Sequence, residues 1–226
     1  MSPHEFWQDI VPAGTYASTA PLTDAWPAAL PDGRQLLLPI RTLPGDGTRG
    51  VAGLICNQAS FVVLDALCDW LAEIVAPHRP EVVVGVPTLG LPLAEGVARR
   101  LGHSRFVPLS TSRKFWYDEA LSVAMASITT PERKKSLYID PRMLPLLVGR
   151  RFVLVDDVVS SGQSLTAALT LLAKAAIIPQ AVAVAMEQGQ AWRAALAAVD
   201  PAWPALVRGV FASPLLTKGA GGWQPA

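Results

Sequence analysis

Two adjacent carboxylates, Asp156 and Asp157, follow a short run of apolar residues at 153–155. After them come two valines and the small-residue segment Ser160-Ser161-Gly162-Gln163-Ser164. Neighbouring carboxylates repel each other and resist burial, so such a pair commonly serves a site. Backbone N–H groups and hydroxyls in a loop that opens a helix can hold an anion. Carboxylates for hydroxyls or a cation, beside a loop for a phosphate, suit a sugar phosphate.

A structural explanation of the same residues is also available. A strand followed by a capped helix needs only one such Asp or Ser residue, and an Asp pair alone is typical of a solvated strand end. The pair and the anion loop coincide here in a strand–loop–helix context, and that coincidence favours a binding site.

Residues 152–164 resemble the phosphoribosyl-pyrophosphate (PRPP) binding motif of type I phosphoribosyltransferases. That motif has mostly apolar residues, an acidic pair, two more apolar residues and a small-residue loop with Gly. The resemblance implies that the acidic pair holds the ribose hydroxyls and that the loop holds the 5′-phosphate. The implied PRPP-binding residues are Asp156, Asp157, Val158, Val159, Ser160, Ser161, Gly162, Gln163 and Ser164.

A second loop follows an apolar run at 81–86 and precedes a helix expected at 90–101. Taken alone, it is an ordinary strand–helix turn. Ligands of open parallel sheets bind outside the carboxyl ends of the strands, where both loops would lie. Beside the PRPP motif, this turn resembles the family's pyrophosphate loop, which uses backbone N–H groups and often a cis peptide. The implied pyrophosphate contacts are Pro87, Thr88, Leu89 and Gly90, without the charged residue that the family often has there.

The segment Phe106-Val107-Pro108 precedes the basic pair Arg113-Lys114, as in adenine phosphoribosyltransferases. Pyrophosphate leaves with several negative charges, which Arg and Lys neutralise well. A loop that closes over bound substrate delivers such charge when it is needed. The resemblance therefore implies that Arg113 and Lys114 act in catalysis together with the acidic pair, although basic loops are often only solvated.

Other residues of the same insertion are weaker candidates. Lys134 and Lys135 lie at its far end, and Trp116 and Tyr117 follow the basic pair. The aromatic rings could stack on a planar base. They could equally cover part of the fold or a contact between subunits.

Strands alternate with helices along the chain, which predicts an α/β fold with a parallel sheet. The expected strands are 35–41, 51–56, 81–86, 104–109, 121–128, 151–155 and 181–186, and the expected helices are 60–76, 90–101, 164–176 and 189–198. Residues 1–34 are expected to form an irregular N-terminal arm. Residues 35–212 would form the phosphoribosyltransferase domain, with a hood from about 35–58 and the C-terminal part. The interval 110–150 would be a flexible hairpin loop, and 213–226 a tail in which Trp223 docks. The resemblance thus implies a type I phosphoribosyltransferase fold.

Composition supports a folded chain without an obvious nucleic-acid surface. The 226 residues are 51% hydrophobic and 16% charged, with a formal net charge of +1. Such a composition favours a buried core over disorder and gives no basic face. The two cysteines, Cys56 and Cys68, are expected to be buried free thiols. With no apolar leader or membrane-length run, we expect a soluble cytoplasmic protein without membrane contacts.

The resemblance implies a glycosyltransferase of nucleotide salvage, which transfers 5-phosphoribose from PRPP to a nucleobase and releases pyrophosphate. Mg²⁺ would be held through PRPP and water near Asp156 and Asp157, without direct protein ligands. Adenine is the favoured base, because Met186-Glu187-Gln188-Gly189 is loosely similar to a segment of adenine phosphoribosyltransferases. Orotate, xanthine and the 6-oxopurines remain open, and a homodimer is expected. The alternatives are a PRPP-sensing regulator of the same fold and, less favoured, a Mg²⁺-dependent phosphatase.

Overall fold

The central sheet is parallel, with the strand order β11-β10-β9-β5-β6. A computed structural model describes residues 2–17, 19, 21–125 and 135–226. The chain order of the strands reverses between β5 and β9, and ligands of open parallel sheets bind outside the carboxyl ends of strands at such a point. The strands of this sheet are β5 (Val82–Gly85), β6 (Val107–Pro108), β9 (Phe152–Val159), β10 (Ala181–Gln188) and β11 (Val207–Ser213).

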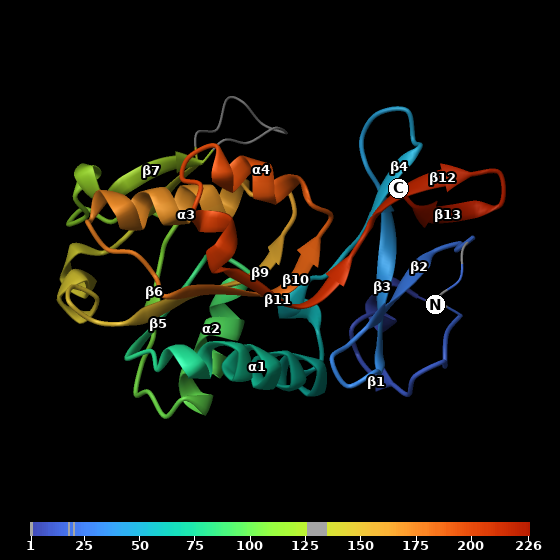
Figure 1. The fold of residues 1–226 in the computed structure, drawn as a ribbon, viewed down its shortest axis with the longest axis horizontal. Helices are drawn as coiled ribbons and strands as arrows, with labels where there is room; N and C mark the ends of the chain where they lie inside the picture. Colours follow the sequence, from blue (N-terminus) through green and yellow to red (C-terminus); the bar gives the residue numbers. More distant parts are fainter. Residues whose placement is uncertain (1, 18, 20, 126–134) are drawn as a thin grey trace.

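Helices cover both faces of this sheet (Figure 1), which explains why its strands are apolar almost throughout. One face packs against α1 and α2, and the other against α3 and α4. The helices are α1 (Phe61–Val75), α2 (Gly90–Arg100), α3 (Gln163–Lys174) and α4 (Ala191–Ala197). Short 3-10 turns are η1 (Pro3–Glu5), η2 (Cys56–Gln58), η3 (Ala76–His78), η4 (Glu119–Leu121), η5 (Pro141–Leu146) and η6 (Trp203–Leu206). The predicted α/β architecture is therefore confirmed, and Cys56 and Cys68 are buried free thiols.

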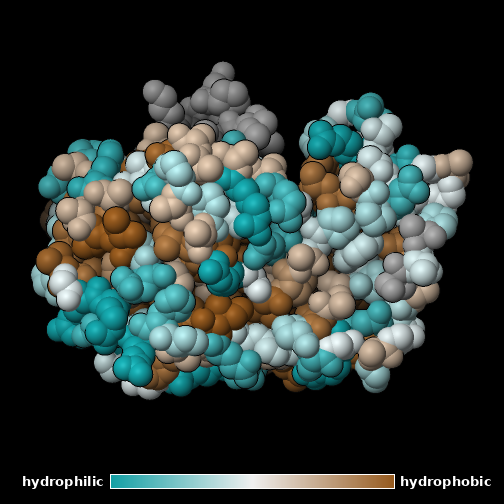
Figure 2. Space-filling view, in the orientation of Figure 1, coloured by the Kyte–Doolittle hydropathy of each residue, from teal (hydrophilic) through white to brown (hydrophobic). Residues whose placement is uncertain are grey.

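A second, antiparallel sheet forms the hood beside the carboxyl ends of β9 and β10 (Figure 1). Its order is β1-β3-β4-β12-β13, and β2 also pairs with β3. The hood strands are β1 (Ile10–Val11), β2 (Ala25–Ala29), β3 (Gln35–Thr42), β4 (Arg49–Ala52), β12 (Leu215–Gly219) and β13 (Gly222–Pro225). Figure 2 shows that the surface is indented between the hood and the larger unit.

Both chain ends differ from the expectation of an irregular arm and a tail. The segment 1–34 contributes β1 and β2, and Phe6 and Trp7 are buried within it. The strand signal is weak because β2 contains Pro27, which a strand paired on one side tolerates. At the other end, Trp223 is 5% exposed and packs against Gly50 of β4. The two ends therefore complete the hood sheet.

The insertion contains the expected hairpin within its described parts. The strand predicted at 121–128 is present as β7 (Ser122–Met125), which pairs with β8 (Lys135–Tyr138). Leu137 and Ile139 are fully buried in the same cluster as the apolar side of α3. Lys174 Nζ of α3 donates to the Ser122 carbonyl at 3.0 Å. Apolar side chains at alternate positions thus fix this hairpin on the helix layer.

Across the described ranges, every helix is either too short or too polar to cross a lipid bilayer.

Candidate active site

The turn at 87–90 lies directly against the acidic pair at the switch point of the sheet. A Cβ built on Gly90 would lie 2.8 Å from both Cα and Oδ1 of Asp156, and 3.0 Å from the Val155 carbonyl. These distances are too short for any side chain, so this close approach requires glycine. The backbone N–H of Val86 also donates to the Val155 carbonyl at 3.0 Å. The sheet therefore brings the turn at 87–90 against the acidic pair, two features that the sequence singles out.

The peptide bond between Pro87 and Thr88 is cis. The turn continues into α2, which begins at Gly90. The first N–H groups of a helix lack partners within the helix, so they are available to an anion. The turn and the helix start together offer backbone donors beside the acidic pair.

The acidic pair belongs to β9, which runs through Val159 rather than ending before Asp156 as expected. Asp156 is 3% exposed, and its Oδ1 accepts a hydrogen bond from the Asp157 N–H at 2.9 Å. Burial raises the pKa of Asp156 well above its usual range, and the neighbouring Asp157 charge raises it further. Burial also raises the pKa of Asp157. Because buried negative charge is costly, the pair gains free energy from hydroxyl donors or a cation.

The loop at 160–164 packs against α4 at Gly162. Gly162 has a φ of +84° and precedes the first residue of α3. A Cβ at Gly162 would lie 3.1 Å from Cα of Trp192 and 3.2 Å from Cβ of Ala195. A residue larger than glycine would therefore push the loop off α4. The loop opens a helix of 12 residues, whose positive N-terminal end favours an anion.

The expected hood comes close to the acidic pair at Cys56. Cys56 is fully buried, and burial followed by the nearby charge of Asp157 raises the pKa of its thiol. The hood segment 53–56 is fixed by two hydrogen bonds that flank it. Trp7 Nε1 donates to the Gly53 carbonyl at 3.0 Å, and Gln188 Nε2 donates to the Ala52 carbonyl at 2.7 Å. Only the long-range pairing of the hood sheet places these groups together, so periodicity along the chain could not predict them.

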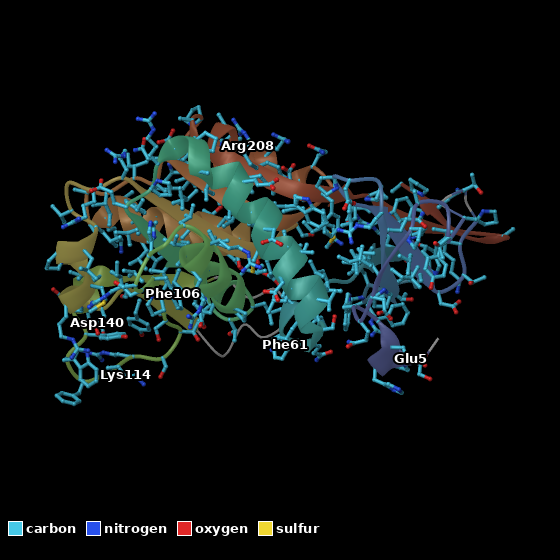
Figure 3. The ribbon with its side chains drawn as sticks, turned by 90° about the horizontal axis from the view of Figure 1, so that it is seen from below. Glu5, Phe61, Phe106, Lys114, Asp140 and Arg208 are labelled. Atoms are coloured by element: carbon cyan, nitrogen blue, oxygen red, sulfur yellow. The ribbon has the colours of Figure 1, made fainter. Side chains whose placement is uncertain are left out.

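The basic pair does not lie beside these loops. Arg113 Nη1 is 2.8 Å from Glu119 Oε1, and both side chains are more than half exposed. Figure 3 shows Lys114 beside Asp140, toward the end of the molecule away from the hood. A catalytic role for Arg113 and Lys114 stays a prediction, and it requires a rearrangement of this segment or a second copy of the chain.

The aromatic candidates contact the insertion itself. Trp116 Nε1 donates to Asp140 Oδ2 at 3.2 Å, and the Arg142 guanidinium lies 4.5 Å from the Trp116 ring centroid. The rings of Tyr117 and Tyr138 lie 5.9 Å apart. Lys134 and the side chain of Lys135 lie outside the described part of the chain. Base stacking by Trp116 or Tyr117 is therefore untested and would require these contacts to change.

The donor set at the acidic pair suits a hard cation that is shared with a substrate. Within the described residues there is no cluster of three or more His, Cys, Asp or Glu side chains that could enclose a metal. Asp156 and Asp157 offer carboxylate oxygens, which Mg²⁺ accepts together with substrate phosphates and water. A cavity of about 1070 Å³ lies elsewhere, between residues 4–9 and β2 and β3 of the hood, and the residues of the two loops do not line it.

The family model for the phosphoribosyl transferase domain matches residues 57–197. An adenine phosphoribosyltransferase from Streptomyces avermitilis is 29% identical over 146 residues, which cover 65% of this chain and 75% of that protein. A hypoxanthine/guanine phosphoribosyltransferase from Methanohalobium evestigatum is 32% identical over 108 residues, or 48% of this chain. That match spans about half of the relative, 52% of its length.

Solved structures show the same fold. The adenine phosphoribosyltransferase of Giardia lamblia in complex with 9-deazaadenine aligns with a TM-score of 0.55 and 22% identity, over 77% of this chain and 93% of that chain. The adenine phosphoribosyltransferase of Thermoanaerobacter pseudethanolicus aligns with a TM-score of 0.53 and 19% identity, over 67% and 81% of the two chains. The predicted type I fold is thus confirmed. Since the family model covers more than half of the sequence, including both loops of the site, this chain belongs to the phosphoribosyl transferase family.

Proposed function

We propose that this protein transfers the 5-phosphoribosyl group of PRPP to a purine base, with adenine favoured, and releases pyrophosphate. The observation that carries the proposal is the contact between Gly90 and Asp156. It sets a buried acidic pair and an anion-binding turn side by side at the switch point of the sheet. We further propose that the protein acts in purine salvage in the cytoplasm as a homodimer.

The acidic pair and the following loop would bind the ribose 5-phosphate part of PRPP. The 2′- and 3′-hydroxyls donate hydrogen bonds to Asp156 and Asp157, which compensates the cost of their burial. The 5′-phosphate accepts from backbone N–H groups and hydroxyls at 160–164, at the start of α3. Holding both ends of the sugar fixes the position of C1′ relative to the base.

The turn at 87–90 would bind the pyrophosphate. Its backbone N–H groups, together with the start of α2, face the position beside Asp156. The base nitrogen forms its bond to C1′ as the bond from C1′ to pyrophosphate breaks, and the bonding electrons leave with pyrophosphate. The base then loses its N–H proton to solvent. Mg²⁺ bound between PRPP and water near the acidic pair would neutralise part of the phosphate charge.

Arg113 and Lys114 would supply positive charge to the departing pyrophosphate. In the present arrangement Arg113 pairs with Glu119. Catalysis by these residues therefore requires the segment to move onto the site or to come from the other subunit of a dimer. This engagement of Arg113 is the observation that favours the second candidate function, a PRPP-sensing regulator without turnover.

The choice of a purine rests on relatives whose names specify adenine and hypoxanthine/guanine. Incubation with Mg²⁺, PRPP and single bases, followed by measurement of pyrophosphate and nucleotide, tests the proposal. We expect equal amounts of both products with adenine, weaker turnover with 6-oxopurines, and none with orotate. PRPP binding without product on any base would instead support the regulator.

A further inference from the structure

Gln188 is a buried polar residue at the carboxyl end of β10, on the strand next to the acidic pair. Its side chain is 6% exposed. Glu187 pairs with Val159 of β9, so Gln188 lies one step further, beside the start of the loop at 160–164. On its other side, Gln188 pairs with Ser213 of β11. The residue is therefore at the edge of the sheet where the two loops of the site meet.

The amide of Gln188 bridges the seam between the sheet and the hood. Its Nε2 donates to the Ala52 carbonyl at 2.7 Å and lies 3.5 Å from Ser213 Oγ. Ala52 ends β4 and leads into the hood segment 53–56. In this segment, burial and then the nearby charge of Asp157 raise the pKa of the Cys56 thiol. Hence the amide, the hood segment and the acidic pair share one side of the site.

The orientation of this amide is fixed by chemistry. A carbonyl only accepts hydrogen bonds, so the Ala52 oxygen must face the NH₂ group of Gln188. A flipped amide would set two acceptor oxygens against each other. Oε1 therefore points away from Ala52, and it receives no hydrogen bond from the described residues.

This oxygen is also not fully enclosed by the described residues. The fully enclosed side-chain atoms without a partner in the described residues are His103 Nδ1, Thr166 Oγ1 and Trp192 Nε1, and Gln188 Oε1 is not among them. Its neighbour Glu187 is already engaged. Glu187 Oε1 accepts from the Gly209 N–H at 2.8 Å, and its Oε2 accepts from Arg193 Nη2 at 3.3 Å. Of these two side chains, Gln188 is thus the one with an oxygen that receives no hydrogen bond from the described residues.

A fixed acceptor discriminates between purines. Position 6 of a 6-aminopurine carries N–H donors, whereas a 6-oxopurine has an oxygen acceptor there. The first can bond to Oε1, and the second would face it with lone pairs. Because the Ala52 carbonyl prevents the amide from flipping, the site cannot adapt to the 6-oxo group.

From these contacts we infer that Gln188 determines base specificity by accepting a hydrogen bond from the 6-amino group of the purine. This inference rests on the proposed transfer from PRPP to a purine.

The test compares kcat/KM for adenine and hypoxanthine in the wild type, Gln188→Met and Gln188→Glu, at saturating PRPP. Met keeps the length of the side chain and removes the acceptor. We expect it to lower kcat/KM for adenine about tenfold and to leave hypoxanthine within about threefold. Glu keeps an acceptor oxygen but removes the donor to the Ala52 carbonyl. It should therefore lower kcat/KM for both bases while most of the preference for adenine remains.

If Gln188 only held the hood in place, its loss would affect both bases alike. The variant Trp7→Phe shows how large such an effect is. Trp7→Phe removes the bond to the Gly53 carbonyl without touching the amide. This variant should lower kcat/KM for adenine and for hypoxanthine by the same factor. If Gln188→Met also lowers kcat/KM for the two bases equally, the inference is overturned. It is also overturned if Gln188→Glu loses the preference for adenine as Gln188→Met does.

A ligand-side measurement covers the case in which a variant does not fold. Purine, which lacks the 6-amino group, should react with the wild type about tenfold less efficiently than adenine. Equal kcat/KM for the two, or a wild-type preference for hypoxanthine, would contradict the role of Gln188 while leaving phosphoribosyl transfer intact. PRPP binding without transfer to any base would instead overturn the proposed function, and this inference with it.

Discussion

At the scale of single residues, the candidate site holds buried negative charge. A ligand with hydroxyl donors, or a cation, would compensate this charge. Asp156 is 3% exposed, and burial together with Asp157 raises its pKa. A buried carboxylate without a counter-charge destabilises the folded state. The acidic pair therefore costs stability in the free protein.

Asp156→Asn should accordingly stabilise the free protein at neutral pH, by about 1–3 kcal/mol. Asn keeps the oxygen that accepts from the Asp157 N–H and removes the charge. Urea unfolding of both proteins at pH 8 measures the difference. Glu73→Gln, at an exposed position of α1, is the matched control and should leave stability within about 0.5 kcal/mol. A less stable Asn variant would contradict a buried, uncompensated charge.

The gain from Asp156→Asn should also depend on pH. The pKa of Asp156 is raised in the folded state above its unfolded value of about 3.9. Between those two values the folded state binds the extra proton, so wild-type stability falls as pH rises through the folded pKa. The Asn variant has no titrating group at position 156, so its stability does not show this decrease. The gain should therefore grow as pH rises and vanish near about pH 4, and a gain that is constant with pH would contradict the raised pKa.

Gly90→Ala tests the contact between the turn at 87–90 and the acidic pair. The new Cβ would lie 2.8 Å from Asp156 Cα, so the turn and β9 must separate. We expect a loss of about 1–3 kcal/mol in unfolding free energy and at least tenfold weaker PRPP binding. Gly219→Ala is the matched control, because a Cβ there meets its nearest neighbour at 3.7 Å and φ is not positive. If both variants bound PRPP equally well, the turn at 87–90 would not be part of the site.

At the scale of elements, the predictable parts are those whose signal is local. Apolar runs marked β5, β9 and β10, and helical spacing marked α1 to within a residue at each end. The acidic pair and the loop at 160–164 were readable because their chemistry is contiguous in sequence. Even there the end of β9 was placed too early, since charged residues seldom continue a buried strand.

Strand β3 of the hood was predicted nearly to its bounds, but the pairing of the hood was less predictable because it depends on distant partners. β4 pairs with β12, more than 150 residues later in the chain, and β2 carries a proline at an edge position. Ala52 and Gln188 meet only after the hood sheet has formed. A pattern read along the chain contains no signal for such a contact.

The insertion contributes the prediction that concerns catalytic rate. Arg113→Ala combined with Lys114→Ala should lower kcat at least tenfold with little change in the Kd for PRPP, because the charge is needed as pyrophosphate leaves. Steady-state kinetics and PRPP titration separate the two effects. Arg99→Ala, which removes one exposed Arg that pairs with Glu95 on α2, is the surface control. Unchanged kcat would remove the pair from the mechanism.

At the scale of the whole molecule, the hood and the sheet share one hydrophobic cluster. Leu36 and Leu38 of β3 belong to the same buried cluster as Val155 of β9 and the apolar side of α1. The chain also passes from β11 of the parallel sheet directly into β12 of the hood (Figure 1). Stability of the hood and geometry of the site are therefore coupled.

Trp223→Ala should reveal this coupling. The substitution removes a side chain that is 5% exposed and packs on Gly50, so we expect a loss of about 3–5 kcal/mol. Because the hood forms one wall of the site, KM for the base should rise more than KM for PRPP. Thermal unfolding and kinetics measure both effects, and a normal KM for the base in a destabilised variant would separate the hood from base binding.

The central claim is that PRPP binds at the acidic pair. Calorimetric titration of PRPP with Mg²⁺ into the wild type and the Asp156→Asn, Asp157→Asn double variant tests it most directly. We predict micromolar-range binding to the wild type, of order 1–100 μM, and at least a hundredfold weaker binding to a double variant that remains folded. Equal affinity for the two proteins would contradict the account.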